Sequence, residues 1–232
     1  MIDRIKTYLE QRKHKNILIH IGKCGGTSLK QAIKESEKLK ITKVVHVDKP
    51  IFIQNKNYYI VARDPISRCI SSFNWRYKLV VTDQIQKHRF KGEYDVLKKY
   101  QILNHLVEKL YDKEGNLNSE IAAEFETIHH LRERISYYLK EFLKDCQPSM
   151  IKGVFMQESL NADIDKYLDV NNHGKPAEKL NNTSKGKGLS SLGKANLVKY
   201  IQDDYHCLFT LNQLGHIDDK TMLTIFENAL SN

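Results

Sequence analysis

One short segment, residues 17–33 with the sequence ILIHIGKCGGTSLKQAI, constrains the fold of this chain more than any other stretch. Its first part, Ile17 to Ile21, is rich in isoleucine, which is typical of a strand buried on both faces of a parallel sheet. Gly22, Gly25 and Gly26 then allow a tight turn whose backbone amides can approach a ligand closely. Apolar residues at helical spacing follow, so the segment predicts a strand, a turn and a helix that begins at the turn.

The predicted turn has the features of an anion site. Free backbone N–H groups, the positive end of the helix dipole, the hydroxyls of Thr27 and Ser28 and the ammonium of Lys23 converge there, and phosphate or sulfate is the matching ligand. Ser28 and Gln31 fit a capping box, so we expect Thr27 or Ser28 to cap the helix. The common nucleotide triphosphate loop places a Lys-Ser/Thr pair after its last glycine. Here Lys23 precedes the paired glycines, which argues against an ATPase.

A second anion motif, RDPISRCIS, directly follows the apolar segment Tyr58 to Ala62, which we predict to be another buried strand. Asp64 can cap a helix in which Pro65 occupies the first turn. Arg63 then stands between the end of the strand and the start of the helix, and Ser71 lies two turns into the helix. A guanidinium and a hydroxyl in this arrangement suit a terminal phosphate.

The order Lys-x-Gly-Gly-Thr-Ser after one strand and Arg-Asp-Pro-x-x-Arg-x-x-Ser after a later one resembles the nucleotide-binding motifs of sulfotransferases that use 3′-phosphoadenosine 5′-phosphosulfate (PAPS). The resemblance is strongest to the group that includes the heparan sulfate 2-O-sulfotransferases. It implies that the 5′-phosphosulfate is bound by Lys23, Cys24, Gly25, Gly26, Thr27 and Ser28, and that the 3′-phosphate is bound by Arg63 and Ser71. It also implies a late basic loop that closes over the nucleotide, with Lys185 as a contact.

The chemistry implied is in-line transfer of a sulfuryl group to an acceptor that loses a proton. Lys23 is placed to stabilise the oxygen that leaves sulfur, and no metal is expected because a sulfuryl carries less negative charge than a γ-phosphoryl. His46 is the best candidate for the general base, since the family resemblance places a histidine there and the residue lies between the two anion motifs. A histidine that only packs within the strand Val44 to Val47 is the structural alternative. The other candidate bases are Glu158, His130 and His20.

The rest of the pattern predicts one α/β domain over residues 1–232, a P-loop-type parallel sheet flanked by helices. A fourth strand is expected at Ile151 to Met156. Residues 83–145 are charged and helical in pattern with a break at 114–116, and we expect a helical insertion that lies over the sheet as a wall for the acceptor. A loop at 171–187 precedes one helix that starts from Ser190 and a last helix at 218–230.

The first 15 residues predict a basic amphipathic helix with Ile2, Ile5, Tyr8 and Leu9 on one side. We expect that side to pack against the sheet, and docking of the helix to a membrane is the alternative.

The charge of the chain suits an anionic partner. Its 37 Lys and Arg against 28 Asp and Glu give a net charge of +9, which fits a polyanionic cosubstrate, nucleic acid or an acidic membrane surface. No run approaches the ~20 apolar residues that span a bilayer, so we expect a cytoplasmic protein, with peripheral membrane association as the alternative.

The cysteines are widely spaced and lack metal-ligand patterns, so we expect free thiols; they are Cys24, Cys69, Cys146 and Cys207.

The expected function is transfer of a sulfuryl group from PAPS to a hydroxyl acceptor, a saccharide in a glycan or glycolipid. Two alternatives remain open: a P-loop kinase-like phosphotransferase, and a non-catalytic module that binds polyanions or nucleic acid. No recognised nucleic-acid-binding signature supports the last of these, and we expect no nucleic-acid partner. The sequence does not disclose the acceptor or the oligomeric state.

Overall fold

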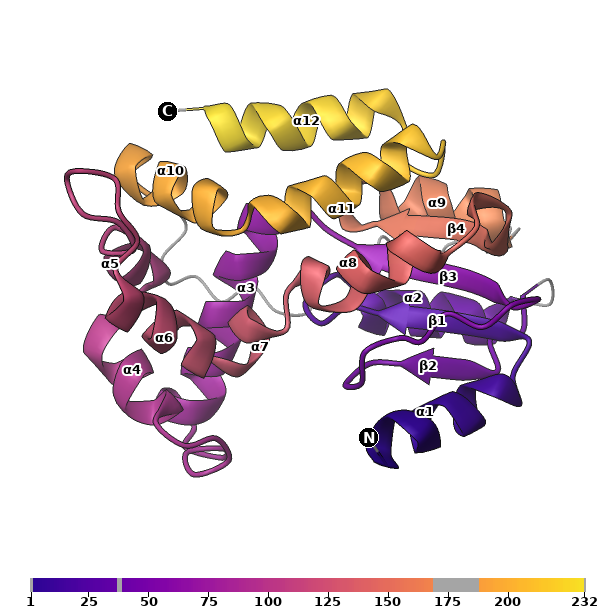
Figure 1. Cartoon of the computed structure of the whole chain (residues 1–232), viewed down its shortest axis with the longest axis horizontal. Coiled ribbons are helices and arrows are strands. Elements are labelled where there is room, and N and C mark those ends of the chain that lie inside the picture. The colour runs from indigo at the N-terminus through magenta and orange to yellow at the C-terminus, as the bar shows by residue number, and fades with distance from the viewer. Residues whose placement is uncertain (1, 37–38, 169–187, 232) are drawn as a thin grey trace.

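The computed structural model describes residues 2–36, 39–168 and 188–231, with side chains from residue 5 onward. In this part of the chain, four parallel strands form one sheet in the order β2-β1-β3-β4 (Figure 1). The strands are β1 (Asn16–His20), β2 (Lys43–Val45), β3 (Asn57–Ala62) and β4 (Ile151–Met156). The prediction of an α/β fold with a parallel sheet flanked by helices is therefore confirmed.

The central strands β1 and β3 are largely buried because helices cover both faces of the sheet. On one face, Tyr167 of α9 (Leu160–Leu168) packs edge-on against Phe155 of β4, beside α2 (Gly26–Glu35). On the other face, Phe142 of α8 (Ile135–Asp145) packs edge-on against Tyr58 of β3. Figure 1 shows α2 behind the sheet and α8 in front of it. This two-sided burial explains why the strands read as continuous apolar runs rather than as alternating ones.

The parallel arrangement places all the strand-to-helix turns at one edge of the sheet. β1 leads into the glycine turn, β2 ends just before His46, β3 leads into Arg63, and β4 leads into Glu158. Ile19 of β1 lies opposite both Val45 of β2 and Ile60 of β3. The carboxyl ends of these three strands are therefore at about the same level in the sheet. Ligands of open α/β sheets bind at this edge.

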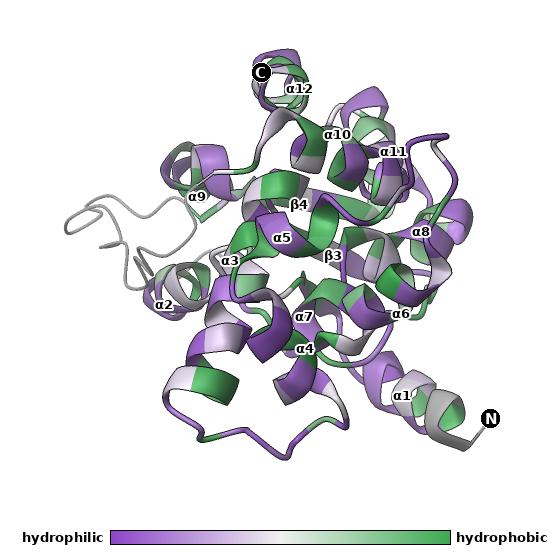
Figure 2. Ribbon diagram, turned by 90° about the vertical axis from the view of Figure 1, so that its left-hand side faces the viewer, coloured by the Kyte–Doolittle hydropathy of each residue, from purple (hydrophilic) through white to green (hydrophobic). Residues whose placement is uncertain are grey.

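The helical insertion differs from the prediction in its position. α3 (Pro65–Tyr77) continues as a π-helical segment (Lys78–Thr82), and the short helices after it surround α3 beyond the carboxyl edge of the sheet (Figure 1). These helices are α4 (Glu93–Tyr100), α5 (Leu103–Val107), α6 (Ser119–Thr127) and α7 (His129–Arg132). Within the predicted insertion, α8 lies over the face of the sheet. Figure 2 views this group of helices from its own end of the molecule.

The insertion is also more broken than its sequence pattern indicates. The predicted break at Gly115, where φ is +82°, lies between α5 and α6, and Tyr111 and Leu117 form an antiparallel bridge across it. Two further breaks follow from Gln101, which has φ +61°, and from Ile128, which is extended. A left-handed or extended residue ends a helix even where the apolar spacing continues.

The predicted single helix from Ser190 is two helices. The Ser190 hydroxyl caps α10 (Ser191–Tyr200) by accepting a 3.0 Å hydrogen bond from the amide of Gly193, as expected. Ile201 then leaves the helical conformation, and the chain continues as α11 (Gln202–Gln213) and α12 (Asp219–Leu230). The loop at 171–187, with the predicted nucleotide contact Lys185, lies outside the described residues.

The amphipathic helix α1 (Ile2–Arg12) does not pack as predicted. Ile5, Tyr8 and Leu9 are exposed, whereas Gln11 is buried against the body of the protein. The Gln11 side-chain oxygen accepts a 3.3 Å hydrogen bond from the amide of Ile51, so a polar contact holds the inward side of α1. Among the described residues, no helix is long and apolar enough to cross a membrane.

Candidate functional site

The turn between β1 and α2 leaves its backbone donors free. α2 begins at Gly26, and its N-cap is Gly25, which has φ +85° and no side-chain capping bond. The prediction that Thr27 or Ser28 caps the helix is therefore wrong. Gln31 instead donates a 3.2 Å hydrogen bond to Glu35, one turn further along α2. Because the first amides of a helix have no intrahelical acceptor, an uncapped N-terminus offers several N–H donors to a ligand.

Gly26 is required by packing as well as by the turn. A Cβ at this position would lie 1.8 Å from Nε2 of His20, whose ring fills the space against the first turn of α2. His20 itself is 8% exposed and belongs to the buried end of β1. The sequence predicted a glycine here because a ligand would approach the backbone closely. The structure shows a second reason, which is that the His20 ring lies against this position.

Lys23 lies at the apex of the turn and is held in an unusual conformation. Its backbone has φ +69°, a region that residues with a Cβ seldom occupy. Its ammonium nitrogen lies 4.4 Å from the ring centroid of Trp75 on α3. Burial, and then the nearby positive charge of Arg63, lower the pKa of Lys23 to about 8. The ammonium therefore has few counter-charges around it, and an anion would stabilise it.

Two arginines of the second motif bind the carbonyl groups of the turn. Arg63 donates from Nη1 to the carbonyl of Lys23 at 3.4 Å, and Arg68 donates from Nε to the carbonyl of Gly22 at 3.0 Å. Arg68 is completely buried, and its Nη2 also donates to the carbonyls of His130 (3.1 Å) and Glu133. The structure thus brings the two predicted anion motifs into direct contact.

Among the described residues, the cations at this turn make no contact ion pair, although buried Asp204 attracts Arg68 and buried Glu158 attracts Arg63 from farther away. Within the described part of the chain, no carboxylate lies within ion-pair distance of Lys23, Arg63 or Arg68. In the same part of the chain, Nε of Arg63 and Nη1 of Arg68 are buried without a hydrogen-bond partner. Buried cationic donors without partners are costly, and a bound oxyanion would supply both charge and acceptors.

Ser71 lies on the side of α3 that faces the turn. Asp64 caps α3 as predicted, accepting a 2.7 Å hydrogen bond from the amide of Ser67. Ser71 stands three residues after Arg68 and four before Trp75, and both of those residues contact the turn. Residues at these spacings share one helix face, so the Ser71 hydroxyl lies on the same side of α3.

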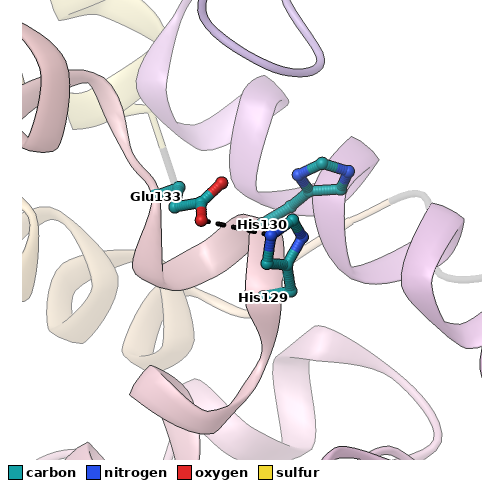
Figure 3. Close-up of side chains that lie close together, drawn as sticks. All are labelled: His129, His130 and Glu133. Carbon is teal, nitrogen blue, oxygen red and sulfur yellow. Dashed lines mark ion pairs between the residues drawn. The ribbon is translucent and has the colours of Figure 1, made fainter. Parts of the chain in front are cut away.

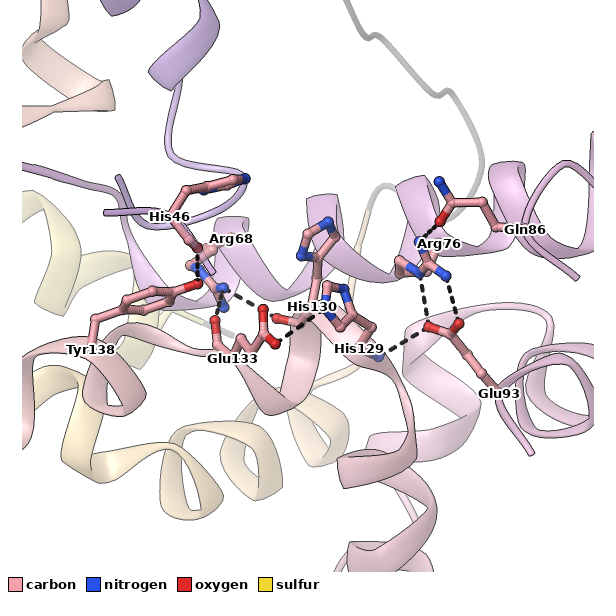
Figure 4. A network of polar contacts seen from close by, with 9 residues as sticks. All are labelled: His46, Arg68, Arg76, Gln86, Glu93, His129, His130, Glu133 and Tyr138. Carbon is pink, nitrogen blue, oxygen red and sulfur yellow. Dashed lines mark hydrogen bonds and ion pairs between the residues drawn. The ribbon is translucent and has the colours of Figure 1, made fainter. Parts of the chain in front are cut away.

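His46 lies just after β2 and is oriented by hydrogen bonds. Its Nδ1 lies 2.8 Å from the carbonyl oxygen of His20, and because a carbonyl oxygen only accepts, Nδ1 carries the proton and Nε2 is the acceptor. Its ring stacks on that of His20 at 4.2 Å, and Tyr138 donates to its carbonyl at 2.6 Å (Figure 4). A Cβ at Gly22 would lie 3.8 Å from Cε1 of His46, so the ring borders the turn.

The alternative bases are less suitable than His46. Burial lowers the pKa of His20 to about 3 and that of His130 to about 2, so both are weak proton acceptors. The Glu158 carboxylate already accepts a 3.0 Å hydrogen bond from the amide of Asp64. His46 combines partial exposure, a fixed tautomer and a position beside the turn.

Cys24 lies in the turn but has no features of a nucleophile. Its thiol is fully buried and lies 3.7 Å from the carbonyl oxygen of Gly22. Burial raises the pKa of this thiol to about 12, so the thiolate does not form at neutral pH. All four cysteines are free, as the sequence predicted, and all four are buried.

Two features of the insertion were not found from the sequence. His129, His130 and Glu133 present ligand atoms within 4.8 Å of one another, and Nε2 of His129 pairs with Glu133 at 3.1 Å (Figure 3). These atoms could hold a metal ion. However, Arg68, Arg76 and Lys23 all lower the pKa of His130, and this positive surrounding opposes a bound cation.

The second feature is a buried ion pair between Arg76 and Glu93, with Nη2 and Oε2 2.6 Å apart. Glu93 also accepts a 3.0 Å hydrogen bond from the amide of His129, which fixes α7 to α3 and α4 (Figure 4). The arginine spacing along α3, with Arg68 and Arg76 two turns apart, is the sequence signal that could have indicated an inward polar face.

The fold and site define an α/β protein with a cationic turn at the carboxyl edge of a parallel sheet. Comparison with known proteins found no matching family model, no matching curated protein and no matching solved structure.

Proposed function

We propose that the protein is a PAPS-dependent sulfotransferase with a P-loop-type nucleotide site. The observation that carries the proposal is the group of three cations, Lys23, Arg63 and Arg68, around a turn with free helix amides and, in the described residues, no carboxylate within ion-pair distance. The order of the two motifs along the chain matches the resemblance stated above, and the two motifs are in contact.

Each group has a defined part in the proposed reaction. The amides at the start of α2, with Lys23, Cys24, Gly25, Gly26, Thr27 and Ser28, bind the 5′-phosphosulfate. Arg63 and Ser71 bind the 3′-phosphate. Because the sulfuryl carries little charge, these donors supply the electrostatic stabilisation that the transfer needs.

The transfer proceeds in line. The acceptor oxygen forms a bond to sulfur while the bond from sulfur to the bridging phosphate oxygen breaks. Nε2 of His46 takes the acceptor proton, and the ammonium of Lys23 stabilises the charge on the departing oxygen. In the free protein that ammonium lies over Trp75, so it leaves the ring when the donor binds.

Calorimetry with 3′-phosphoadenosine 5′-phosphate (PAP) tests the nucleotide site. Arg63→Ala removes a charge-assisted contact to the 3′-phosphate, and we expect PAP to bind about 10- to 100-fold more weakly. Arg89→Ala, which removes an exposed arginine from the insertion, is the matched control and should bind PAP like the unaltered protein.

Other outcomes of the same titration separate the alternatives. Absence of PAP binding, or equal binding in Arg63→Ala, contradicts the proposal. Magnesium-dependent ATP binding without PAP binding would indicate a kinase-like phosphotransferase. Steeply salt-dependent binding of any polyanion, without nucleotide preference, would indicate a non-catalytic module.

A saccharide is the proposed acceptor. A groove of about 390 Å³ lies between α1 and the end of β2, and both polar and apolar side chains line it, His46 among them. The groove presents ammonium, carboxylate and hydroxyl groups from Lys6, Glu10 and Thr7, which suit hydrogen bonds to sugar hydroxyls, and Val44, Val45 and Val47 add apolar surface.

A further inference from the structure

The helix α1 turns its apolar side toward solvent. Ile5 is 53% exposed, Tyr8 38% and Leu9 52%, and their spacing places them on one stripe of the helix. The inward side instead carries Gln11, which is 1% exposed. This arrangement reverses the usual orientation of a surface helix, so the exposed stripe needs an explanation outside the core.

Several polar contacts attach this inward side, among the described side chains of α1. Gln11 accepts from the amide of Ile51, and Lys56 donates to the carbonyl of Arg12 at 2.6 Å. Glu10 lies 3.6 Å from Lys43 at the start of β2. The apolar stripe is only partly covered by the rest of the protein, and its exposed surface remains available to a partner.

Basic side chains accompany the apolar stripe. Lys6 and Arg12 are exposed on α1, and Lys13 and Lys15 are exposed in the residues just after it. Glu10, the acidic residue among the described side chains of α1, is engaged by Lys13 at 3.2 Å and by Lys43. The exposed side of α1 thus combines aliphatic and aromatic groups with an excess of positive charge.

We propose that α1 docks in the plane of an anionic membrane surface. Ile5, Tyr8 and Leu9 enter the interface between headgroups and acyl chains, and Lys6, Arg12 and Lys13 contact the phosphate groups. Both views place α1 at the periphery of the molecule, where a flat surface can reach it (Figures 1 and 2). Three apolar side chains give weak insertion by themselves, so the negative charge of the lipid is necessary.

The docking surface adjoins the candidate acceptor groove. Lys6 and Thr7 of α1 and the exposed Val47 line this groove together with His46. This part of the inference rests on the proposed function: a docked enzyme would receive an acceptor saccharide carried on a membrane lipid. The docking itself depends only on α1 and is tested without any transfer reaction.

Cosedimentation with lipid vesicles tests the docking. We expect the full chain to bind vesicles of phosphatidylglycerol and phosphatidylcholine, and to bind pure phosphatidylcholine vesicles at least about tenfold more weakly. The double variant Ile5→Ser/Leu9→Ser should lose at least about tenfold in binding to the anionic vesicles. Because both side chains are exposed, the variant should keep the thermal stability of the unaltered protein and its affinity for PAP.

A matched double variant controls for exposed apolar surface in general. Leu223→Ser/Leu230→Ser alters two side chains of α12 that are 59% and 81% exposed, and it should bind anionic vesicles like the unaltered protein. Equal binding to both kinds of vesicle, or full binding by the α1 variant, would overturn the proposal. So would a dimer in solution that the α1 variant abolishes, because a second copy would then be the occupant of the stripe. If the unaltered protein binds anionic vesicles but not PAP, the proposed sulfotransferase function is contradicted and the proposed membrane docking is still supported.

Discussion

His46 shows how a single residue acquires a chemical role from a contact distant in sequence. Its Nδ1 donates to the carbonyl of His20, 26 residues earlier, and this bond leaves Nε2 as the free acceptor of the ring. A strand pattern predicts only that a side chain points to one face or the other. The hydrogen bond fixes both the direction of the ring and its tautomer.

Substitution of His46 tests its role at this scale. For His46→Ala we expect kcat to fall by about 10²- to 10⁴-fold, because a general base contributes that much, while PAP affinity changes less than about threefold. Single-turnover transfer from labelled PAPS to a saccharide mixture, with PAP calorimetry alongside, measures both quantities. His216→Ala, which alters a histidine that contacts Pro148 away from the turn, is the control. Full activity in His46→Ala would assign the base to another residue.

At the scale of elements, the strand–turn–helix segment was predictable and its details were not. The strand and helix are present where apolar spacing placed them, and Asp64 caps α3 as its sequence indicates. The cap of α2 was predicted wrongly, because Gly25 adopts a left-handed conformation and starts the helix before Ser28. Capping preferences are local, whereas this turn is also shaped by the arginines that bind its carbonyls.

Gly26 provides a prediction about this element. Alanine ordinarily stabilises a helix by about 1 kcal/mol relative to glycine. Gly26→Ala should instead destabilise the protein by about 2–4 kcal/mol, because the new Cβ would lie 1.8 Å from the His20 ring. Urea unfolding measures the change, and the double variant Gly26→Ala/His20→Ala should recover part of it.

A second glycine serves as the reference for that experiment. A Cβ at Gly188 would meet nothing within 4 Å in the described structure, so Gly188→Ala should change the free energy of unfolding by less than about 0.5 kcal/mol. Equal stability of Gly26→Ala and the unaltered protein would show that the His20 ring can leave its place beside α2.

At the scale of the whole molecule, two buried neutral histidines connect stability to pH. Burial lowers the pKa of His20 to about 3 and that of His130 to about 2, whereas both titrate near 6.5 when unfolded. Between these values the unfolded chain binds more protons than the folded protein, so stability rises with pH and is lost on acidification. The loss therefore begins as pH falls through 6.5.

We expect the free energy of unfolding to fall by about 2 kcal/mol per histidine between pH 7.5 and pH 5. Urea unfolding at intermediate pH values measures this slope, and His130→Gln should reduce it by about half. A free energy of unfolding that stays constant between pH 7.5 and pH 5 would contradict the burial of these rings as neutral groups.

The sequence by itself determined the α/β class, the four strands, the glycine turn and the position of the two motifs at the ends of strands, because each of these depends on neighbouring residues and their spacing. Tertiary structure decided the rest. It placed the insertion beyond the edge of the sheet, turned the apolar stripe of α1 outward and put the Lys23 ammonium over Trp75. These features depend on burial and on partners far along the chain, as with Arg68 and the carbonyl of Glu133, 65 residues later. A local pattern states what a side chain prefers, and only the packed chain determines which partners it finds.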